Sequence, residues 1–387
     1  MKKNKNRILR TITAGILALA MMPMSGCHHE PQQPDRIFNI TVIVKDLNST
    51  YWNPVQQACD DLKAEYGDTV NITFTGPDEE SAEKQIPVIE KAIADKVDAI
   101  VLAACDPEAE NETLAKATAA GIPIITIDSD VTYEGKASYV GTMNETAGKS
   151  AARYAADLLD NEGTIGIIYH GSASTASERR DGFLEQIQSG SAPEQELAAG
   201  AGAKQNNSLP VPAEDAELET LEDGTPVTPP AQPIPAEEEV PAGLYSNIKI
   251  AEVLDGESDW SVSKDQAMKL IQEDHVDLIF ATNRKGVWGA CEAVNDLISS
   301  GELQQGQVKI VGFDYFENDG RDAGMYLSKD ILNTTIIQNP YNMGYLGVRY
   351  AVELANGSPI PTKVDTGAIL VTKDNINDAD IQFLISN

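Results

Sequence analysis

The 387-residue sequence has few cysteines, few histidines and a marked shortage of basic residues. It contains 29 Lys and Arg against 60 Asp and Glu, which gives a formal net charge of −31 at pH 7. A surface this acidic repels phosphate backbones, so we do not expect nucleic-acid binding. Cys27, His28 and His29 are adjacent but have no further Cys or His nearby in the chain, so we expect no metal site and no cofactor.

Two sequence signatures of enzymes are also missing. A dinucleotide-binding loop needs Gly-x-Gly-x-x-Gly after its first strand, but no glycine occurs between Lys45 and Trp52. The nucleophile elbow Gly-x-Ser-x-Gly does not occur either. The sequence therefore favours a binding protein over an enzyme.

Beyond residue 27, the sequence has no apolar run long enough to cross a membrane. Before it, five Lys and Arg within the first ten residues precede the short apolar stretch 12–22, a pattern typical of a signal peptide. Residues 24–27 read Met-Ser-Gly-Cys and resemble the lipobox of bacterial lipoproteins. We therefore predict a signal peptide over 1–26, a lipid on Cys27 and a tether over 27–36. The mature protein would be extracytoplasmic and anchored to the bacterial membrane.

Three other cysteines remain, an odd number for an exported protein. Cys59 lies on the apolar stripe of an expected helix, and Cys105 follows an expected strand. Burial as free thiols is the simpler interpretation for these two and for Cys291. A bridge between Cys59 and Cys105 stays open, because spacing alone does not decide it.

The chain alternates between apolar β-branched runs and segments with helical spacing. After a strand near 40–44 and a helix near 55–66, we expect strands at 70–75, 98–103, 124–127, 137–140, 163–169, 248–253, 277–281, 308–312, 333–337 and 363–371. We expect helices at 81–95, 107–120, 145–159, 176–188, 261–273, 286–298 and 341–356. Such alternation predicts parallel sheets with right-handed crossovers. The number of units favours two similar α/β lobes over one large sheet.

An insertion interrupts the second half at 191–243. It holds nine prolines, many acids and a single base, Lys204. This composition cannot bury enough apolar surface to offset its ordering entropy, so we predict a disordered segment. A spacer is the simpler interpretation, and an interaction tail is the alternative.

Candidate ligand groups follow the expected strands. They are Lys45, Asp46, Asn48, Tyr51, Trp52, Asp128, Ser177, Arg179, Trp260, Asn283, Asp314 and Gln338. In open α/β sheets, ligands bind beyond the carboxyl ends of the strands, where these loops lie. Carboxylates and amides can bond vicinal hydroxyls, while aromatic rings stack on the apolar face of a sugar. The set therefore indicates a sugar site.

Several motifs occur in a fixed order along the chain. They are LNSTYW at 47–52, PIITID at 123–128, SERRDGF at 177–183, ATN at 281–283, VGFD at 311–314 and TIIQNPYNMG at 335–344. In this order the chain resembles the ribose-binding-protein-like, type I periplasmic binding proteins of ABC sugar importers. The resemblance runs from about residue 38 to 372, interrupted by the insertion.

The resemblance implies two Rossmann-like lobes, each a parallel sheet flanked by helices, joined by a three-strand hinge. The N-terminal lobe would comprise 37–141 and 339–361. The C-terminal lobe would comprise 142–338 and 362–387, with the insertion inside it. The implied function is capture of a monosaccharide in the cleft between the lobes and its delivery to an ABC permease by a monomeric, membrane-anchored protein.

The resemblance also assigns roles to the candidate residues. Tyr51 and Trp52 would hold the sugar ring from the first lobe and Trp260 from the second, while Asp128, Asn283, Asp314 and Gln338 would bond its hydroxyls. Asn48 would line the first loop, and Lys45 matches a lysine of arabinose-type members. Ser129 and Ser177 stand where ribose binders have arginine, although Arg179 is near, so ribose itself is in question. Trp288 fits a core position better than a ligand contact.

Two further classes share this fold. A sensor would present the same sugar-bound form to a chemoreceptor or histidine kinase, and the sequence does not separate it from a transport protein. A repressor of the lactose-repressor type would need a DNA-binding headpiece, where we predict a signal peptide instead.

Overall fold

The computed structural model describes residues 36–171, 173–191, 243–318 and 321–385, and the chain from Ile37 onward forms one compact unit. The predicted signal peptide, Cys27 with most of the tether, and the insertion over 192–242 lie outside the described residues. Within the described ranges, no helix combines the length and apolar character needed to span a bilayer.

The first sheet has the strand order β13-β5-β4-β3-β1-β2, and its neighbouring strands run parallel. Its strands are β1 (Phe38–Ile43), β2 (Val70–Thr75), β3 (Ala99–Leu102), β4 (Ile124–Ile127), β5 (Ser138–Gly141) and β13 (Lys363–Asp365). Helices α1 (Asn53–Tyr66) and α9 (Pro340–Ala355) pack on one face, and α2 (Ala82–Ala94) and α3 (Asn111–Ala119) on the other. Because helices cover both faces, β3 and β4 are buried along their whole length, and their residues are apolar except for Thr126.

The second sheet has the order β14-β12-β9-β8-β6-β7 and is parallel except for the edge strand β14. Its strands are β6 (Glu162–Tyr169), β7 (Asn247–Asp255), β8 (Leu278–Ala281), β9 (Lys309–Phe313), β12 (Thr334–Gln338) and β14 (Ala368–Val371). Helices α4 (Asn144–Leu158) and α5 (Ser174–Ser191) pack on one face, and α6 (Trp260–Gln272) and α7 (Arg284–Ser300) on the other. The hairpin β10 (Glu317–Asn318) and β11 (Arg321–Asp322), with helices α8 (Ala323–Ser328) and α10 (Ala379–Ile385), completes this half.

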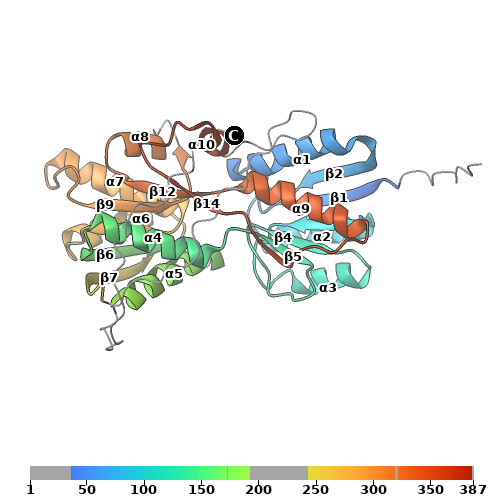
Figure 1. The fold of residues 1–387 in the computed structure, drawn as a ribbon, viewed down its shortest axis with the longest axis horizontal. Coiled ribbons are helices and arrows are strands. Elements are labelled where there is room, and N and C mark those ends of the chain that lie inside the picture. The colour runs from blue at the N-terminus through green and yellow to red at the C-terminus, as the bar shows by residue number, and fades with distance from the viewer. Residues whose placement is uncertain (1–35, 172, 192–242, 319–320, 386–387) are drawn as a thin grey trace, which may run out of the picture. The chain divides into compact units, whose positions relative to one another are not determined.

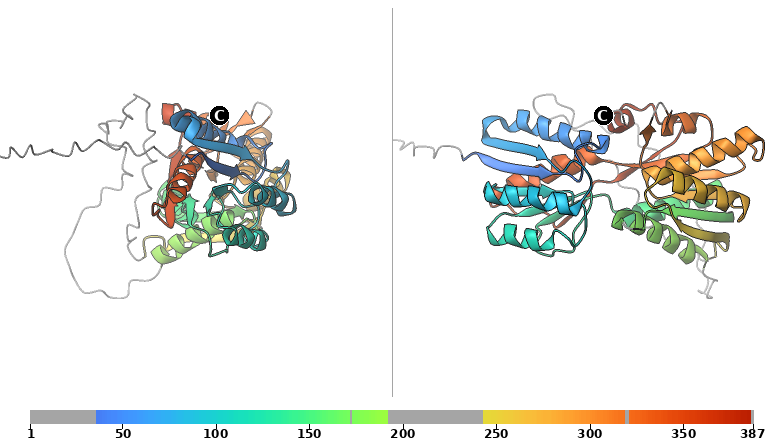
Figure 2. Two further views of the ribbon diagram at one scale, coloured as in Figure 1. Left: turned by 90° about the vertical axis from the view of Figure 1, so that its right-hand side faces the viewer. Right: turned by 180° about the vertical axis from the view of Figure 1, so that it is seen from behind.

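The chain passes between the two sheets three times, from β5 to α4, from β12 to α9 and from β13 to β14 (Figures 1 and 2). Two of these connections bond to each other, since the Thr366 amide donates to the Gly141 carbonyl at 3.0 Å. The Thr142 hydroxyl donates to the Gly367 carbonyl at 3.2 Å. The predicted fold class, two α/β lobes joined by three connections, is confirmed.

One predicted boundary differs from the structure. Residues 362–387 were assigned to the second lobe, yet β13 pairs with β5 of the first sheet, with Lys363 opposite Tyr139. The single strand expected over 363–371 is in fact two strands, separated by Thr366 and Gly367. Gly367 has φ +73°, in the left-handed region that glycine adopts without strain, so the chain can change direction there. Both halves are extended, so the hydrophobic pattern could not show the break. The other limits of the two lobes stay predictions.

Helices α4 and α5 lie in backbone contact. A Cβ atom on Gly148 would lie 2.1 Å from the Arg179 carbonyl oxygen, and one on Gly182 would lie 2.1 Å from the Glu145 carbonyl oxygen. Only glycine permits this approach at either position. This contact fixes the position of α5 relative to α4, and therefore the position of Arg179 on α5.

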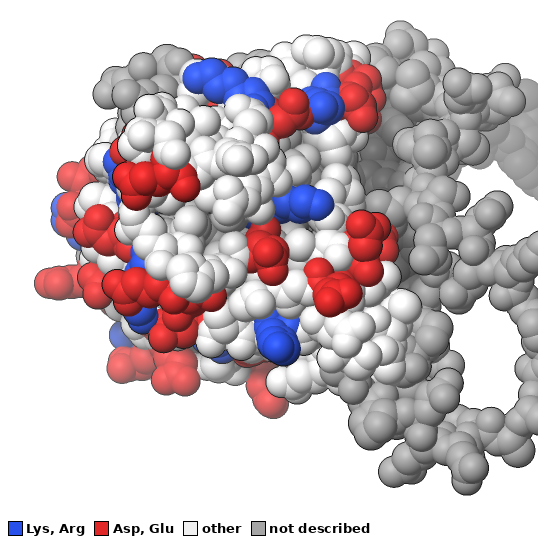
Figure 3. Space-filling model, turned by 90° about the vertical axis from the view of Figure 1, so that its left-hand side faces the viewer, with Lys and Arg blue, Asp and Glu red and all other residues white. Residues whose placement is uncertain are grey.

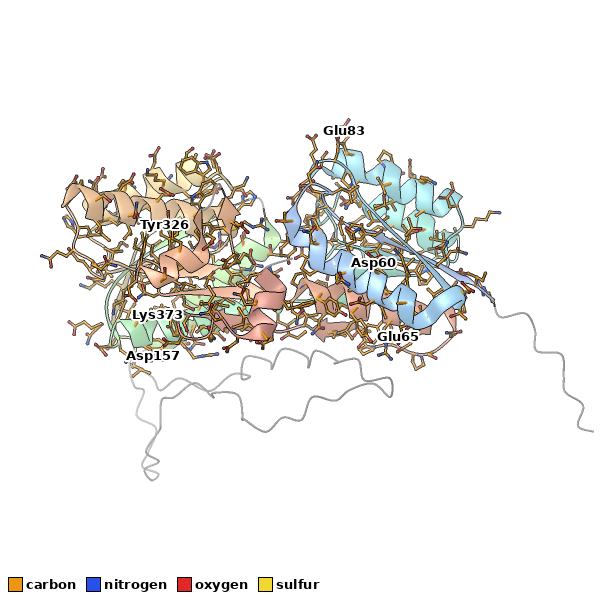
Figure 4. The ribbon with its side chains drawn as sticks, turned by 90° about the horizontal axis from the view of Figure 1, so that it is seen from above. Asp60, Glu65, Glu83, Asp157, Tyr326 and Lys373 are labelled. Carbon is orange, nitrogen blue, oxygen red and sulfur yellow. The ribbon has the colours of Figure 1, made fainter. Side chains whose placement is uncertain are left out.

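Many acidic side chains of the described residues lie on the outer surface. Asp60 and Glu65 on α1 and Glu83 on α2 are exposed side chains of helices that cover the first sheet (Figure 4). Acidic side chains also spread over the end of the second lobe, with a few basic ones among them (Figure 3). These charges leave the apolar clusters beneath the helices uninterrupted, so they bear on solubility and not on the fold.

Candidate functional site

Asp128 is the centre of a polar group in the first lobe. It directly follows β4, is 6% exposed, and has φ +60°, a left-handed backbone that costs energy for a residue with a side chain. The Tyr51 hydroxyl donates to Asp128 Oδ1 at 2.7 Å, and the Ser129 hydroxyl donates to Oδ2 at 2.9 Å. Lys45 Nζ lies 3.3 Å from Oδ2. Three predicted residues, Lys45, Tyr51 and Asp128, therefore meet as one cluster.

The protonation of this cluster follows from its burial and its charges. Burial raises the pKa of Asp128, but the Lys45 charge and the hydrogen bonds from Tyr51 and Ser129 outweigh it and hold that pKa below its usual range. Burial, together with the Asp128 charge, raises the pKa of the Tyr51 hydroxyl well above its usual value. At neutral pH the carboxylate is therefore charged and the phenol remains a donor.

Lys45 reaches this cluster from the loop after β1. Its Nζ lies 3.7 Å from Glu80 Oε1 as well as near Asp128. Burial lowers the pKa of Lys45, but the two carboxylates more than compensate and raise it above the ordinary value. Lys45 is therefore a charged donor with 17% of its side chain exposed.

Asp314 has the equivalent place in the second lobe. It directly follows β9, and its φ is +70°. Its amide donates to the Ile336 carbonyl of β12 at 2.7 Å, which fixes the strained backbone. Gln338 Nε2 donates to Asp314 Oδ1 at 2.8 Å, and Arg179 Nη1 lies 3.3 Å from Oδ2.

Arg179 is held on every side. It is 3% exposed, and its guanidinium carbon lies 3.7 Å from the centroid of the Phe313 ring. Its Nε donates to Asn144 Oδ1 at 2.8 Å, and its Nη1 donates to the Thr282 carbonyl at 3.0 Å. Arg179 was predicted as a ligand contact, and the bonds found here are to the protein. This geometry makes it the residue that positions Asp314.

A cavity of about 260 Å³ lies between groups from both sheets. Its lining residues are Thr50, Tyr51, Asn53, Pro54, Arg284, Asp314, Tyr315, Glu317, Ile337, Gln338, Pro340, Leu384 and Ile385. Three predicted site residues, Tyr51, Asp314 and Gln338, are among them. Asp128 lies behind the lining, in hydrogen-bond contact with Tyr51.

The two predicted tryptophans occupy different environments. Trp52 is 4% exposed and packs in the apolar cluster under α1, with its ring edge-on to Tyr51. Trp260 is 37% exposed and stacks on Trp288 at 4.8 Å between ring centroids. Trp288 packs against the core of the second lobe, as expected. Neither predicted tryptophan lines the cavity, so their contact with a ligand stays a prediction.

Two of the remaining predicted residues, Asn283 and Asn48, form hydrogen bonds within the protein. Asn283 Oδ1 caps α7 by accepting from the Gly286 amide at 2.9 Å, which leaves its Nδ2 3.5 Å from the Ser258 hydroxyl. Asn48 is exposed, and its Nδ2 donates to the Asp78 carbonyl at 2.5 Å. Ser177 is half-buried on α5. None of these three lines the cavity.

Sequence reasoning missed Arg284, Tyr315 and Asn144. Arg284 follows the predicted Asn283 directly, and Tyr315 follows Asp314, so their positions beside motif residues were a usable signal. Asn144 had no such signal, because its role depends on the contact between α4 and α5.

The described parts of the chain contain no group of three or more His, Cys, Asp or Glu arranged to hold a metal ion. Cys59 and Cys291 are buried free thiols, as the simpler interpretation expected, and Cys105 is a half-buried free thiol. No bridge joins Cys59 and Cys105.

The family model described as "Periplasmic binding protein domain" matches residues 40–217 and 232–359. This chain belongs to that family. The order of its strands and its similarity to ribose-binding proteins identify it as a ribose-binding-like type I periplasmic binding protein.

Curated relatives are similar over different lengths. The ribose import binding protein RbsB of Bacillus subtilis is 24% identical over 370 residues, 91% of this chain and 97% of that protein. A D-ribose/D-allose-binding protein of Pseudomonas aeruginosa is 27% identical over 196 residues, 48% of this chain and 60% of that protein. This second match thus spans less than two thirds of the relative. Both names describe binding proteins and not enzymes.

Solved structures of similar proteins agree on the fold. A sugar-binding protein of a sugar ABC transporter from Bacillus halodurans has a TM-score of 0.67 and 25% identity, covering 88% of this chain and 99% of that one. A carbohydrate transporter solute-binding protein from Agrobacterium radiobacter, in complex with D-arabinose, has a TM-score of 0.65 and 25% identity, covering 90% and 99%.

Proposed function

We propose that this protein captures a monosaccharide between its two lobes and delivers it to an ABC importer. The observation that carries the proposal is the cavity that combines Tyr51 of the first lobe with Asp314 and Gln338 of the second. The relatives named above, which bind ribose, allose or arabinose by their names, support the same class of ligand.

The chemistry of this cavity suits a polyhydroxylated ring. The Asp314 carboxylate and the Gln338 amide offer acceptors and donors side by side, which fits two neighbouring hydroxyls. The Tyr51 ring supplies an apolar face for the C–H groups of a sugar. Asp314 is already oriented by Arg179, so little side-chain freedom is lost when a ligand binds.

Both lobes contribute residues to the cavity. A ligand that contacts both lobes therefore stabilises the closed conformation. The ligand shifts the population of lobe arrangements only through its higher affinity for one of them. The three chain connections between the sheets are where such a rotation would be absorbed. A permease could then distinguish loaded from empty protein by the relative position of the lobes.

The place of action belongs to the same proposal. The family and the N-terminal sequence support an extracytoplasmic protein, with Cys27 lipidated and residues 27–36 as a tether. We expect a monomer that is attached to the membrane by this lipid anchor and that also contacts the permease. Mass spectrometry of the cell-purified protein tests this directly, because a diacylglycerol on Cys27 adds a defined mass to the mature N-terminal peptide.

Calorimetry with a panel of pentoses, hexoses, deoxysugars and polyols tests the binding function. For a sugar that binds, Asp314→Asn and Asp128→Asn should each weaken affinity at least about tenfold, about 1.4 kcal/mol. Asp330→Asn is the matched control, because Asp330 is exposed in the second lobe and pairs with Lys373 away from the cavity. Absence of binding to every sugar, or equal affinity in all three variants, would overturn the proposal.

A further inference from the structure

Arg284 is a cavity-lining residue whose charge has no carboxylate partner among the residues that the structure describes. It is the first residue of α7 and is partly buried. Its guanidinium faces the Tyr51 ring of the other lobe at 5.9 Å from the centroid. Within the described ranges, no Asp or Glu forms an ion pair with it.

The other cations near the site are neutralised. Lys45 pairs with Asp128 and Glu80, and Arg179 pairs with Asp314. A partly buried guanidinium without an anionic partner is costly, and Arg284 also stands at the positive end of a helix, which raises that cost. Lys285 adds a second positive charge beside it, on the exposed side of the same turn.

Two carboxylates share the cavity with Arg284. Asp314 is already bonded to Arg179 and Gln338 through both of its oxygens. Glu317 lines the cavity too, but it is exposed and forms no ion pair with Arg284. The positive charge of Arg284 is thus available to whatever enters.

We infer that the ligand is an acidic monosaccharide, whose negative group pairs with Arg284 while its hydroxyls bond Asp314 and Gln338. The inference rests on the proposed sugar-binding function and names the substrate class within it. A planar guanidinium offers a forked pair of donors that fits either a carboxylate or a phosphate ester. The carboxylate source is a uronic or aldonic acid, and the phosphate source is a sugar phosphate.

Calorimetry on matched ligand pairs tests this inference with the full chain. The pairs are D-glucose and D-glucuronate, D-galactose and D-galacturonate, and D-ribose and D-ribose 5-phosphate. We expect an acid of at least one pair to bind at least about tenfold more tightly than its neutral parent at low salt, with the preference falling as salt rises. Which pair responds decides between a carboxylate and a phosphate.

Variants at α7 make the result specific. Arg284→Gln should reduce the preference for the acid over its neutral parent at least about tenfold. Arg284→Lys should keep part of it, because the charge remains without the forked geometry. Lys285→Gln is the matched control, because it removes a neighbouring charge that does not line the cavity, and it should change the preference less than about twofold.

The outcomes separate this inference from the function on which it depends. The inference of an acidic ligand is wrong if neutral sugars bind more tightly than their acids, or if Arg284→Gln and Lys285→Gln change the preference for the acid equally. Sugar binding itself would still stand. If neither member of any pair binds, the sugar-binding function itself fails.

Discussion

Asp128 in the first lobe and Asp314 in the second occupy the same place in their sheets. Each follows a parallel strand directly, and each has a left-handed backbone, φ +60° and φ +70°. Aspartate tolerates this conformation better than most residues, yet it remains a strained position. Its repetition in both lobes is consistent with the two carboxylates having related roles.

Their partners differ in origin. Asp128 is bonded by Lys45 and Tyr51, which belong to the loop and short helix after β1, and Tyr51 also lines the cavity. Asp314 is bonded by Gln338 and by Arg179, whose guanidinium is fixed by three other contacts. The second lobe therefore presents its carboxylate at the cavity, oriented by a buried arginine, whereas Asp128 of the first lobe lies behind the lining and contacts it through Tyr51.

The largest expected difference between the lobes concerns their tryptophans. Trp52→Ala should destabilise the protein by about 3–5 kcal/mol, because it empties a buried position beneath α1. Trp260→Ala should cost only about 1 kcal/mol, the worth of its stacking on Trp288. Urea unfolding measures both. A loss at Trp52 no larger than about 1 kcal/mol would contradict its contribution to the core.

The second difference concerns the cations that hold the two aspartates. Arg179→Ala should lower the free energy of unfolding by about 3 kcal/mol, because the Asp314 carboxylate loses its cation and Asn144 loses its hydrogen-bond donor. Lys45→Ala should cost about 1 kcal/mol, since Asp128 keeps the bonds from Tyr51 and Ser129.

Arg180→Ala is the control for Arg179. Arg180 is the next residue on α5 and pairs with the exposed Asp181, so its removal should cost less than about 1 kcal/mol. Unfolding in urea compares the three variants. A loss at Arg180 as large as that at Arg179 would contradict the positioning role.

A third contrast lies in two buried glutamates. Glu292 in the second lobe accepts hydrogen bonds from Tyr326 at 2.7 Å and Trp288 at 3.3 Å. Glu110 in the first lobe is fully buried, and neither carboxylate oxygen has a well-aligned partner among the described residues. Burial raises the pKa of Glu110 more than nearby backbone amides lower it, and the resulting pKa is about 7.

This raised pKa predicts a pH dependence. The folded state holds the Glu110 proton more tightly than the unfolded chain, so stability from this group is present at low pH and is lost as pH rises from about 4.5 to about 7. Glu110→Gln should therefore raise the free energy of unfolding by about 2 kcal/mol at pH 8 and change it little at pH 4. Thermal unfolding across this range measures it, with Glu292→Gln as the control that should not stabilise. A gain at pH 4 equal to that at pH 8 would contradict the assignment.

The smallest expected effect concerns Asp128. Tyr51→Phe removes one hydrogen bond from its carboxylate, so the pKa of Asp128 should move upward, toward its usual value. Carbon-13 NMR titration of the aspartate carboxyl groups measures the shift. An unchanged Asp128 pKa would show that Lys45 and Ser129 suffice to stabilise the charge.

Much of the fold could be predicted from the pattern of apolar residues. The strand 124–127 has the expected bounds, and the helix expected over 81–95 differs from α2 by one residue at each end. The short elements β10, β11, α8 and α10 were not expected. They lack the length that periodicity needs, and their packing on the second lobe decides their conformation.

The site was predictable only in part. Position after a strand was enough to select Asp128 and Asp314, because the carboxyl ends of parallel strands share one edge of the sheet. The same logic selected Trp52 and Asn283, but the structure buries the first and uses the second to cap a helix. Loop position specifies the edge of the sheet and not the direction of a side chain.

The sequence alone determined the two-lobe α/β class and the loops that carry polar groups, since strand and helix periods are local properties of the chain. Only the tertiary structure decided that residues 363–365 join the first sheet and 368–371 the second. It also decided that Arg179 holds Asp314, and that Arg284 lines the cavity without a carboxylate partner among the described residues. Those facts depend on contacts between residues far apart in the chain, and burial and charge pairing exist only once those residues have come together.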